Sequence, residues 1–256
     1  MIKKINTNNS SQFSNSDNFD YGGEDINLLE SADNYFKLIL ENFDGCIGTN
    51  ILEVGAGTGN LTKWLRIQYP DANITALEPS SNMIKSINEK NIENITIKQG
   101  FLKDCYKDLQ DQYDTIIYNN VLEHVEDDQA EINLSYQILK EDGYLLSYNP
   151  ALQALYDHHD ESVGHYRRYQ KADLKTKYIN SGFKIKKAKY HDMLGAFLMF
   201  VKYKVIKSTN IEQGSAVLYF DKVLPIVDKF EKYLPVPFGK NLFVIGRKQL
   251  KKEVIK

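Results

Sequence analysis

Three glycines in the first third of the chain have a spacing that favours ligand binding through the main chain. Gly55, Gly57 and Gly59 alternate with single residues, follow the short apolar run 51–54 and precede an amphipathic segment over residues 58–69. Glycine lets the backbone turn tightly between a strand and a helix, and it lets a ligand approach the main chain. The pattern indicates a cradle for a nucleoside-containing cofactor; the alternative is a tight strand-to-helix connection without a ligand.

The register of these glycines bears on which cofactor is bound. A dinucleotide fingerprint has the order G-x-G-x-x-G, but here Asn60 holds the third glycine's position and the glycine comes one residue earlier. Glu78 ends the next predicted strand, about 20 residues further on, where a carboxylate can accept hydrogen bonds from two ribose hydroxyls. A nicotinamide cofactor would also use an acidic residue here, and the glycine register argues against it.

A second group of polar residues, 155–169, can do acid–base chemistry or bind anions. His165 is the best candidate for a general base, because a neutral imidazole has a pKa near ~6.5; its alternative is a hydrogen-bonded loop histidine. Arg167 and Arg168, followed by Tyr169, can grip a carboxylate or a phosphate. The alternative for the arginines is ion pairing that holds the loop shut, with the candidate partners Asp157, Asp160, Glu161 and Asp173.

Other histidines invite a catalytic or a metal-binding interpretation. His124 follows the predicted strand 113–119 and either packs near the active site or acts directly in catalysis. Residue types that suit a divalent ion gather after Pro150: His158, His159, Asp160 and Glu161, with His165 or the pair His191 and Asp192. Their spacing is not diagnostic, because neighbouring residues point in different directions. We therefore assign no metal site from the sequence and interpret the segment as a polar active-site loop.

Strand and helix patterns alternate along the chain. Strands are expected over residues 51–54, 73–78, 95–98, 113–119, 144–148, 183–190 and 242–245. Helices are expected over residues 25–43, 58–69, 80–90 (capped by Ser80), 127–140 (stopped by the turn at Asp142 and Gly143), 172–180 and most of 193–238. This order predicts an α/β fold of the Rossmann-like, doubly wound class: a mainly parallel seven-stranded sheet with a helical cap inserted before the last strand.

The same pattern predicts the domain organisation. Residues 25–192 and 239–250 form the core, 193–238 the cap and 251–256 a tail. Residues 1–24 are either a mobile tail or a lid in which Phe19 and Tyr21 fold over the cofactor. Apolar side chains of the cap line a substrate pocket, pack on the sheet or form a dimer contact: Met193, Phe197, Met199, Phe200, Tyr203 and Tyr219.

The motif E-x-G-x-G-x-G that begins at Glu53 resembles the first motif of class I S-adenosylmethionine-dependent methyltransferases. The resemblance extends over residues 47–150, and the segment Gly-His-x-Arg-Arg-Tyr at residues 164–169 resembles a bacterial subgroup of that family. It implies the following cofactor contacts: Glu53 at the amino end, Gly55, Ala56, Gly57 and Gly59 at the turn, Glu78 and Pro79 at the ribose, Phe101 and Leu102 at the adenine, and Asn120 and Val121 at the methionine portion.

The chemistry implied by this resemblance is methyl transfer from S-adenosylmethionine. A sulfonium methyl is already electrophilic, so the enzyme must place a nucleophile in line with the S–CH3 bond, about 3 Å away, and exclude water. A hydroxyl acceptor also needs a base, whereas a carboxylate acceptor does not. We expect a small-molecule acceptor, methylated at oxygen, with some apolar surface and an anionic group. The alternatives are an NAD(P)-dependent oxidoreductase and a non-catalytic cofactor-binding protein of the same fold.

Composition narrows the partners. A net charge of −2 over 256 residues provides no general attraction to nucleic acid or to a membrane surface. Two cysteines, Cys46 and Cys105, form neither a disulfide framework nor a Cys-x-x-Cys metal site. The N-terminus lacks an apolar signal region, and the longest uncharged apolar run, residues 193–201, is too short to span a bilayer. We therefore expect a cytoplasmic protein, either monomeric or a homodimer through its apolar cap.

Overall fold

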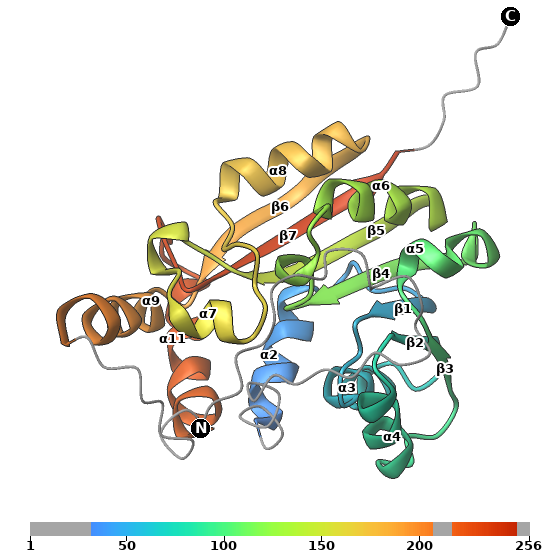
Figure 1. Cartoon of the computed structure of the whole chain (residues 1–256), viewed down its shortest axis with the longest axis horizontal. Helices are drawn as coiled ribbons and strands as arrows, with labels where there is room; N and C mark the ends of the chain where they lie inside the picture. Colours follow the sequence, from blue (N-terminus) through green and yellow to red (C-terminus); the bar gives the residue numbers. More distant parts are fainter. Residues whose placement is uncertain (1–31, 207–216, 250–256) are drawn as a thin grey trace, which may run out of the picture.

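The computed structural model describes residues 32–206 and 217–249. A seven-stranded sheet lies between helices on both of its faces, in the order β3-β2-β1-β4-β5-β7-β6 (Figure 1). The strands are β1 (Asn50–Val54), β2 (Asn73–Glu78), β3 (Ile95–Gln99), β4 (Tyr113–Asn119), β5 (Leu139–Pro150), β6 (Phe183–His191) and β7 (Asn241–Lys248). Only β7 runs antiparallel to its neighbours. The expected Rossmann-like fold with a mainly parallel sheet is confirmed.

The helices follow the expected alternation. The α-helices are α2 (Asp33–Asn42), α3 (Asn60–Gln68), α4 (Ser81–Glu89), α5 (Leu102–Cys105), α6 (Asp128–Ile138), α7 (His158–Ser162), α8 (Lys171–Asn180), α9 (Met193–Phe200) and α11 (Leu224–Glu231). The shorter turns are the 3-10 helices η2 (Tyr106–Leu109), η3 (Leu122–His124) and η4 (Gln153–Leu155) and the π-helices η5 (Val201–Ile206) and η6 (Tyr219–Val223).

Successive strand residues bury their side chains on opposite faces of the sheet. Ile116 and Leu145 pack in the core cluster that contains residues of α5, α6 and α8, whereas their neighbours Ile117 and Leu146 pack with α2 and α3. The side chains of a strand point alternately to its two sides. Strands buried on both faces therefore have continuous apolar runs, as residues 116–118 at the centre of β4 do.

The connectivity places the carboxyl ends of the parallel strands at one edge. β1 pairs with β2 on one side and with β4 on the other, so the order of the strands reverses at β1. Ligands of open α/β sheets bind outside the carboxyl ends of the strands at such a reversal. The loops that follow β1, β2, β4 and β5 therefore define the region in which a functional site is expected.

Two local expectations differ from the structure. The turn at Asp142 and Gly143 does not separate a helix from a strand: it lies inside β5, where the pairing with β4 shifts register. Asp142 has φ of +65°, and a Cβ on Gly143 would lie 2.9 Å from the Lys140 carbonyl oxygen, so the strand is bent there without ending. Ser80 does precede α4, but its side chain makes no capping hydrogen bond.

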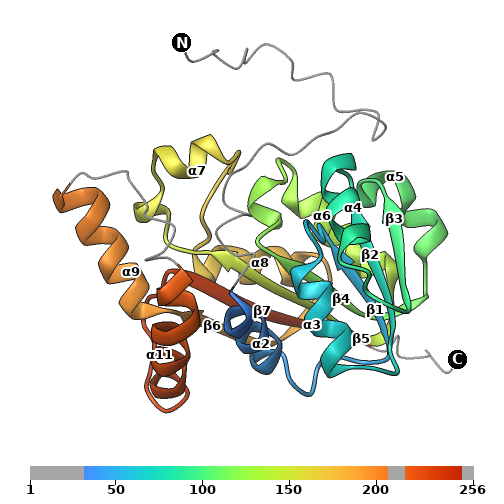
Figure 2. The same ribbon diagram turned by 90° about the horizontal axis from the view of Figure 1, so that it is seen from below.

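The described parts of the segment between β6 and β7, residues 193–206 and 217–231, are helical and lie at the same end of the sheet as α7 (Figures 1 and 2). Several of its apolar side chains face solvent, including Phe197 at 58%, Phe230 at 64% and Tyr233 at 84% exposure. Within the described residues, no helix combines the length and the apolar character needed to cross a membrane. The expected boundaries at residues 1–24 and 251–256, and the expected start of α2 at residue 25, fall outside the described residues.

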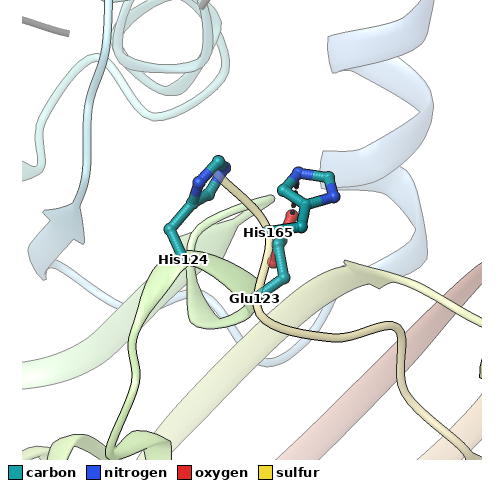
Figure 3. A group of neighbouring side chains, drawn as sticks. All are labelled: Glu123, His124 and His165. Atoms are coloured by element: carbon teal, nitrogen blue, oxygen red, sulfur yellow. Dashed lines mark ion pairs between the residues drawn. The ribbon is translucent and has the colours of Figure 1, made fainter. Parts of the chain in front are cut away.

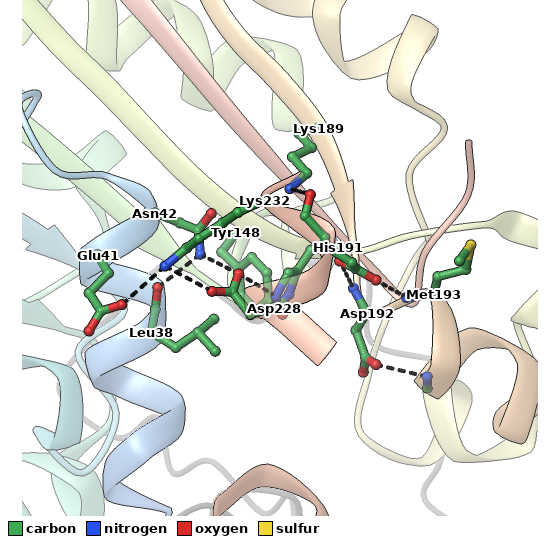
Figure 4. A network of polar contacts seen from close by, with 12 residues as sticks. Leu38, Glu41, Asn42, Tyr148, Lys189, His191, Asp192, Met193, Asp228 and Lys232 are labelled. Atoms are coloured by element: carbon green, nitrogen blue, oxygen red, sulfur yellow. Dashed lines mark hydrogen bonds and ion pairs between the residues drawn. The ribbon is translucent and has the colours of Figure 1, made fainter. Parts of the chain in front are cut away.

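Buried polar contacts anchor this segment to the sheet (Figure 4). His191 at the end of β6 places Nε2 3.2 Å from Oδ1 of Asp228 on α11, and Asn42 of α2 donates a hydrogen bond of 3.0 Å to the same oxygen. Glu231 accepts a 2.7 Å bond from the backbone N–H of Met193. These contacts join α2, β6, α9 and α11, so the insertion is held firmly at its base.

Candidate functional site

The glycine turn connects β1 to α3 in a conformation that other residues rarely adopt. Gly55, Gly57 and Gly59 have φ of +71°, +56° and +80°. The backbone N–H groups of Gly55 and Ala56 donate to the Leu77 carbonyl at 2.8 and 3.2 Å, which ties the turn to the end of β2. Gly59 is the N-cap residue of α3. The predicted strand–turn–helix context of the motif is therefore present.

Gly55 is also constrained by a neighbour from β4. A Cβ added to Gly55 would lie 2.5 Å from Cγ2 of Val121, which follows the end of that strand. Real Cβ atoms essentially never come that close to another atom. The missing side chain of Gly55 therefore lets the segment after β4 approach the turn.

We expect Gly55→Ala to destabilise the protein more than Gly45→Ala, by about 1 kcal/mol or more. Both glycines have φ of +71°, but a Cβ at Gly45 would have nothing within 4 Å. Each substitution carries the left-handed backbone cost of about 1–2 kcal/mol, and only Gly55→Ala adds the overlap with Val121. Urea unfolding of both variants measures the difference. The prediction is contradicted if both variants lose the same free energy of unfolding. It is also contradicted if adding Val121→Ala to Gly55→Ala recovers none of that loss.

Glu78 binds the backbone of the turn with both carboxylate oxygens. Oε2 accepts a 2.8 Å hydrogen bond from the N–H of Gly57, and Oε1 accepts a 3.0 Å bond from the N–H of Ser80. Burial raises the pKa of this carboxyl, and the two backbone bonds counteract that rise. A carboxylate has about four lone-pair sites, so each oxygen retains capacity for a ribose hydroxyl. Pro79 continues the chain between Glu78 and Ser80.

Glu53 is buried at the end of β1, with 2% of the residue exposed. Its Oε2 accepts a 2.6 Å hydrogen bond from the hydroxyl of Thr62. Burial raises its pKa to about 8, and the nearby charge of Glu78 contributes to the rise. The cofactor-free protein therefore holds Glu53 mainly in its protonated form at neutral pH. A cation placed beside it would favour the charged form.

The residues expected at the adenine and methionine portions lie in different surroundings. Phe101 is partly exposed, whereas Leu102 is 1% exposed and packs in the core, so only its backbone is available to a ligand. Asn120, directly after β4, has φ of +52° and donates a 2.9 Å hydrogen bond from its amide to the hydroxyl of Tyr35. Tyr35 was not among the expected site residues; its place four residues before Ile39, on the apolar face of the leading helix, is the signal that could have found it.

Glu123, His124 and His165 come together at this edge and are called the histidine cluster below (Figure 3). Each offers one donor atom, and these atoms all lie within 4.8 Å of one another. The two imidazole rings meet edge to face, with centroids 4.6 Å apart. The backbone N–H of Tyr166 donates a 2.8 Å bond to the Glu123 carbonyl, which holds the loop after α7 against η3. Glu123, to which the sequence analysis gave no role, has a fully buried side chain.

Asp160 orients His165 from behind. Its Oδ1 lies 2.6 Å from Nδ1 of His165, and both of its oxygens accept hydrogen bonds from Nε of Arg168, at 2.9 and 2.8 Å. Burial alone would raise the pKa of Asp160, but the bond from His165 and the charge of Arg168 hold it below its usual range. A carboxylate accepts, so Nδ1 of His165 donates the hydrogen bond, and Nε2 is the ring nitrogen that this contact leaves available.

His124 is a partly buried imidazole that is neutral at neutral pH. Burial lowers its pKa to about 3, and the neighbouring ring of His165 contributes to the shift. A hydrogen bond with the Gly164 backbone acts in the opposite direction, which means that one ring nitrogen donates to the backbone carbonyl. The second nitrogen of the ring then carries a lone pair at neutral pH.

Arg167 and Tyr169 both contact Asp128 at the start of α6. Nη1 of Arg167 lies 2.9 Å from Oδ2 of that carboxylate, and the hydroxyl of Tyr169 donates to it at 2.8 Å. The two arginines are therefore ion-paired within the chain. Asp160 was among the expected partners, and Asp128 was not, because it lies about 40 residues away in sequence and meets the loop only in the folded protein. These contacts favour a positioning role for Arg167 and Tyr169.

The fold and this edge define a class of protein: an α/β domain with a nucleoside-cofactor turn after its first strand. Residues 23–187 match the family described as "Methyltransferase domain", and the chain belongs to that family of class I S-adenosylmethionine-dependent methyltransferases. Membership decides between the two cofactor classes that the glycine motif left open, in favour of S-adenosylmethionine.

The chain is similar to named curated proteins at low sequence identity, and each alignment covers only part of both proteins. The chain is 36% identical over 102 residues to a malonyl-[acyl-carrier protein] O-methyltransferase of Acetivibrio thermocellus. The aligned part is 38% of this chain and 34% of that protein, so the chain spans about a third of the length of this curated relative.

Solved structures share the fold at low sequence identity. The methyltransferase bound to the Trm112 activator of Haloferax volcanii has a TM-score of 0.62 at 14% identity, covering 88% of this chain and 94% of its own. The [4+2]-cyclase SpnF has a TM-score of 0.56 at 18% identity, covering 86% and 81%. Since a cyclase shares this fold, the fold alone does not specify the reaction.

Proposed function

We propose that this protein transfers the methyl group of S-adenosylmethionine to an oxygen atom of a small-molecule acceptor. The observation that carries the proposal is the histidine cluster, at the edge of the sheet where Asn120 and the glycine turn also lie. A malonyl-[acyl-carrier protein] O-methyltransferase is among the relatives, which supports oxygen as the acceptor atom. Glu53, Glu78 and the turn hold the donor, and the cluster faces the acceptor.

A hydroxyl acceptor must lose its proton as the new O–CH3 bond forms. His165 is the candidate base for this proton. Asp160 is bonded to its Nδ1, so Nε2 is available to the hydroxyl of the acceptor. Nε2 lies 3.9 Å from Oε1 of Glu123, so an acceptor oxygen bound at Nε2 would also lie next to the Glu123 carboxylate. We therefore expect the acceptor oxygen beside the histidine cluster.

The acceptor carries apolar surface and an anionic group. Tyr203 of the helical insertion lies near Asp160 and Arg168, whose charges influence its pKa, so the insertion adjoins the candidate site. The exposed apolar side chains of the insertion offer contact area to such a molecule, or to a second copy of the chain. Nη1 of Arg168 has no hydrogen-bond partner among the described residues and is a donor for an anion.

Donor binding is tested by calorimetry with S-adenosylhomocysteine. We expect Glu78→Ala to weaken binding by about 1–3 kcal/mol, because ribose hydroxyls lose their acceptor and the turn loses its tether. Glu89→Ala, at the exposed end of α4, is the matched control and should bind as the unmodified protein does. No binding by the folded unmodified protein, or equal binding by the Glu78 variant, would contradict this assignment.

The second candidate function is cofactor binding without methyl transfer. It is considered because a [4+2]-cyclase has the same fold. A screen with methyl-labelled donor against hydroxyl and carboxyl acceptors separates the two. Acceptor-dependent formation of S-adenosylhomocysteine supports a methyltransferase. Binding of the donor without turnover, across acceptors that differ in charge and apolar surface, supports the second candidate function.

A further inference from the structure

The histidine cluster combines donor types that coordinate metal ions. Two imidazoles and one carboxylate converge from two segments: Glu123 and His124 lie on η3 after β4, and His165 lies in the loop after α7. This is not the set of residues 158–161 whose types suggested a metal in the sequence. The side chain of His158 is 88% exposed and pairs with Glu161, so these two lie outside the cluster, whereas Asp160 contacts His165 on the side away from Glu123.

We propose that Glu123, His124 and His165 bind one divalent transition-metal ion, with zinc, cobalt(II) or iron(II) as the class. Imidazole ligands suit these ions, whereas magnesium and calcium prefer oxygen ligands. Two histidines and one glutamate form a donor set known from catalytic zinc sites, where the remaining position is open to water or substrate.

The geometry needs only a small contraction to close around an ion. Tetrahedral zinc with Zn–N distances of about 2.0–2.1 Å places neighbouring donor atoms about 3.4 Å apart. Nε2 of His165 and Oε1 of Glu123 are 3.9 Å apart, and the widest separation in the cluster is within 4.8 Å. Side-chain rotations that shorten each donor–donor distance by about 0.5 to 1.4 Å therefore suffice.

Groups behind the cluster already orient both imidazoles as metal ligands require. A metal-bound histidine commonly donates its other ring N–H to a carboxylate or a backbone carbonyl. Nδ1 of His165 is bonded to Asp160, and Arg168 fixes that carboxylate in turn. The ring of His124 is hydrogen-bonded to the backbone of Gly164. Each ring thus keeps one nitrogen for an ion.

Charge also favours a cation here. Metal ligands bind in their deprotonated forms, so one carboxylate and two imidazoles would together place one negative charge against the two positive charges of the ion. The side chain of Glu123 is fully buried, and a bound cation would place a positive charge directly beside its carboxylate.

This inference rests on the proposed function in one respect: the role of the ion in catalysis. An acceptor hydroxyl that occupies the open position would be polarised, and its pKa would fall, as that of zinc-bound water does. The proton then leaves to solvent while the oxygen lone pair attacks the methyl carbon and the S–CH3 bond breaks toward sulfur. With the ion bound, Nε2 of His165 would be used for coordination, so the ion would take over the deprotonating role that the metal-free site gives to His165.

The test is a titration of metal-free protein with Co2+, followed by visible absorption, and with Zn2+ in competition. We expect binding of one ion per chain, and at least about tenfold weaker binding for His124→Ala and His165→Ala. His158→Ala, an exposed histidine outside the cluster, is the control and should bind as the unmodified protein does. Asp160→Asn should weaken binding by about 10–100-fold without removing a ligand.

Binding of S-adenosylhomocysteine by each variant verifies its folding independently of the metal. Glu123→Gln keeps the shape of the side chain and replaces a histidine variant that fails this check. The proposal is overturned if folded protein binds neither Co2+ nor Zn2+ more tightly than about 1 mM, or if the cluster variants bind as well as His158→Ala. Because the readout needs no acceptor, a failed methyl-transfer screen with successful metal binding would reject the proposed function and leave the metal site standing.

Discussion

Replacement of Asp160 by alanine is expected to lower the free energy of unfolding by about 3–5 kcal/mol, the cost of breaking a buried ion pair from one side. The side chains of Asp160 and Arg168 are 0% and 4% exposed. Without the carboxylate, the Arg168 guanidinium stays buried next to a cavity, and Nδ1 of His165 loses its acceptor. Urea unfolding at neutral pH measures the loss.

Two comparisons make this prediction specific. Glu161→Ala, one residue further along α7, removes an exposed carboxylate and should change stability by less than about 0.5 kcal/mol. The double variant Asp160→Ala with Arg168→Met should recover much of the loss, because no charge is then left buried without a partner. A loss below about 1 kcal/mol for Asp160→Ala would mean that water or another group replaces the carboxylate.

The same pair predicts a direction for acid sensitivity. The pKa of Asp160 is held below its usual range, so the folded state binds fewer protons there than the unfolded state does. Its contribution is present above the unfolded pKa of about 3.9 and is lost as the pH falls through the folded pKa. The double variant should therefore lose less stability on acidification below about pH 4 than the unmodified protein does.

The second large effect is a gain. Glu53→Gln is expected to stabilise the cofactor-free protein at pH 7 by about 2–3 kcal/mol and to weaken binding of S-adenosylmethionine. Burial raises the pKa of Glu53 from 4.5 to about 8, so between these values the folded state holds a proton that the unfolded state releases. Stability must then fall as the pH rises through this window, and glutamine removes the slope.

Unfolding measured from pH 4.5 to pH 8 in both proteins tests this difference. Calorimetric titration with the cofactor in buffers of different ionisation enthalpy adds a functional readout. If the cofactor's ammonium group lies beside Glu53, binding should release close to one proton at pH 7 in the unmodified protein and none in Glu53→Gln. Parallel pH profiles for the two proteins would contradict the raised pKa, and equal proton release would move the ammonium group elsewhere.

The sheet could be predicted because its evidence is local and repeated. Apolar runs such as residues 116–118, buried on both faces, identify a strand without reference to its neighbours. The boundary of β5 could not be predicted, because a turn sequence such as Asp142-Gly143 also fits a bend within a strand. Pairing with β4 decides between the two, since Tyr113 lies opposite Leu139, before the bend.

The sequence by itself determined the methyl donor: the glycine turn and the carboxylate at the next strand end indicate a nucleoside cofactor, and the family match over residues 23–187 identifies it as S-adenosylmethionine. Only the tertiary structure decided what surrounds the acceptor side. Glu123 and His165 are 42 positions apart and meet because β4 and β5 end at one edge of the sheet. Whether Arg168 grips a ligand or Asp160 depends on which carboxylate is buried beside it, and burial is a property of packing rather than of spacing.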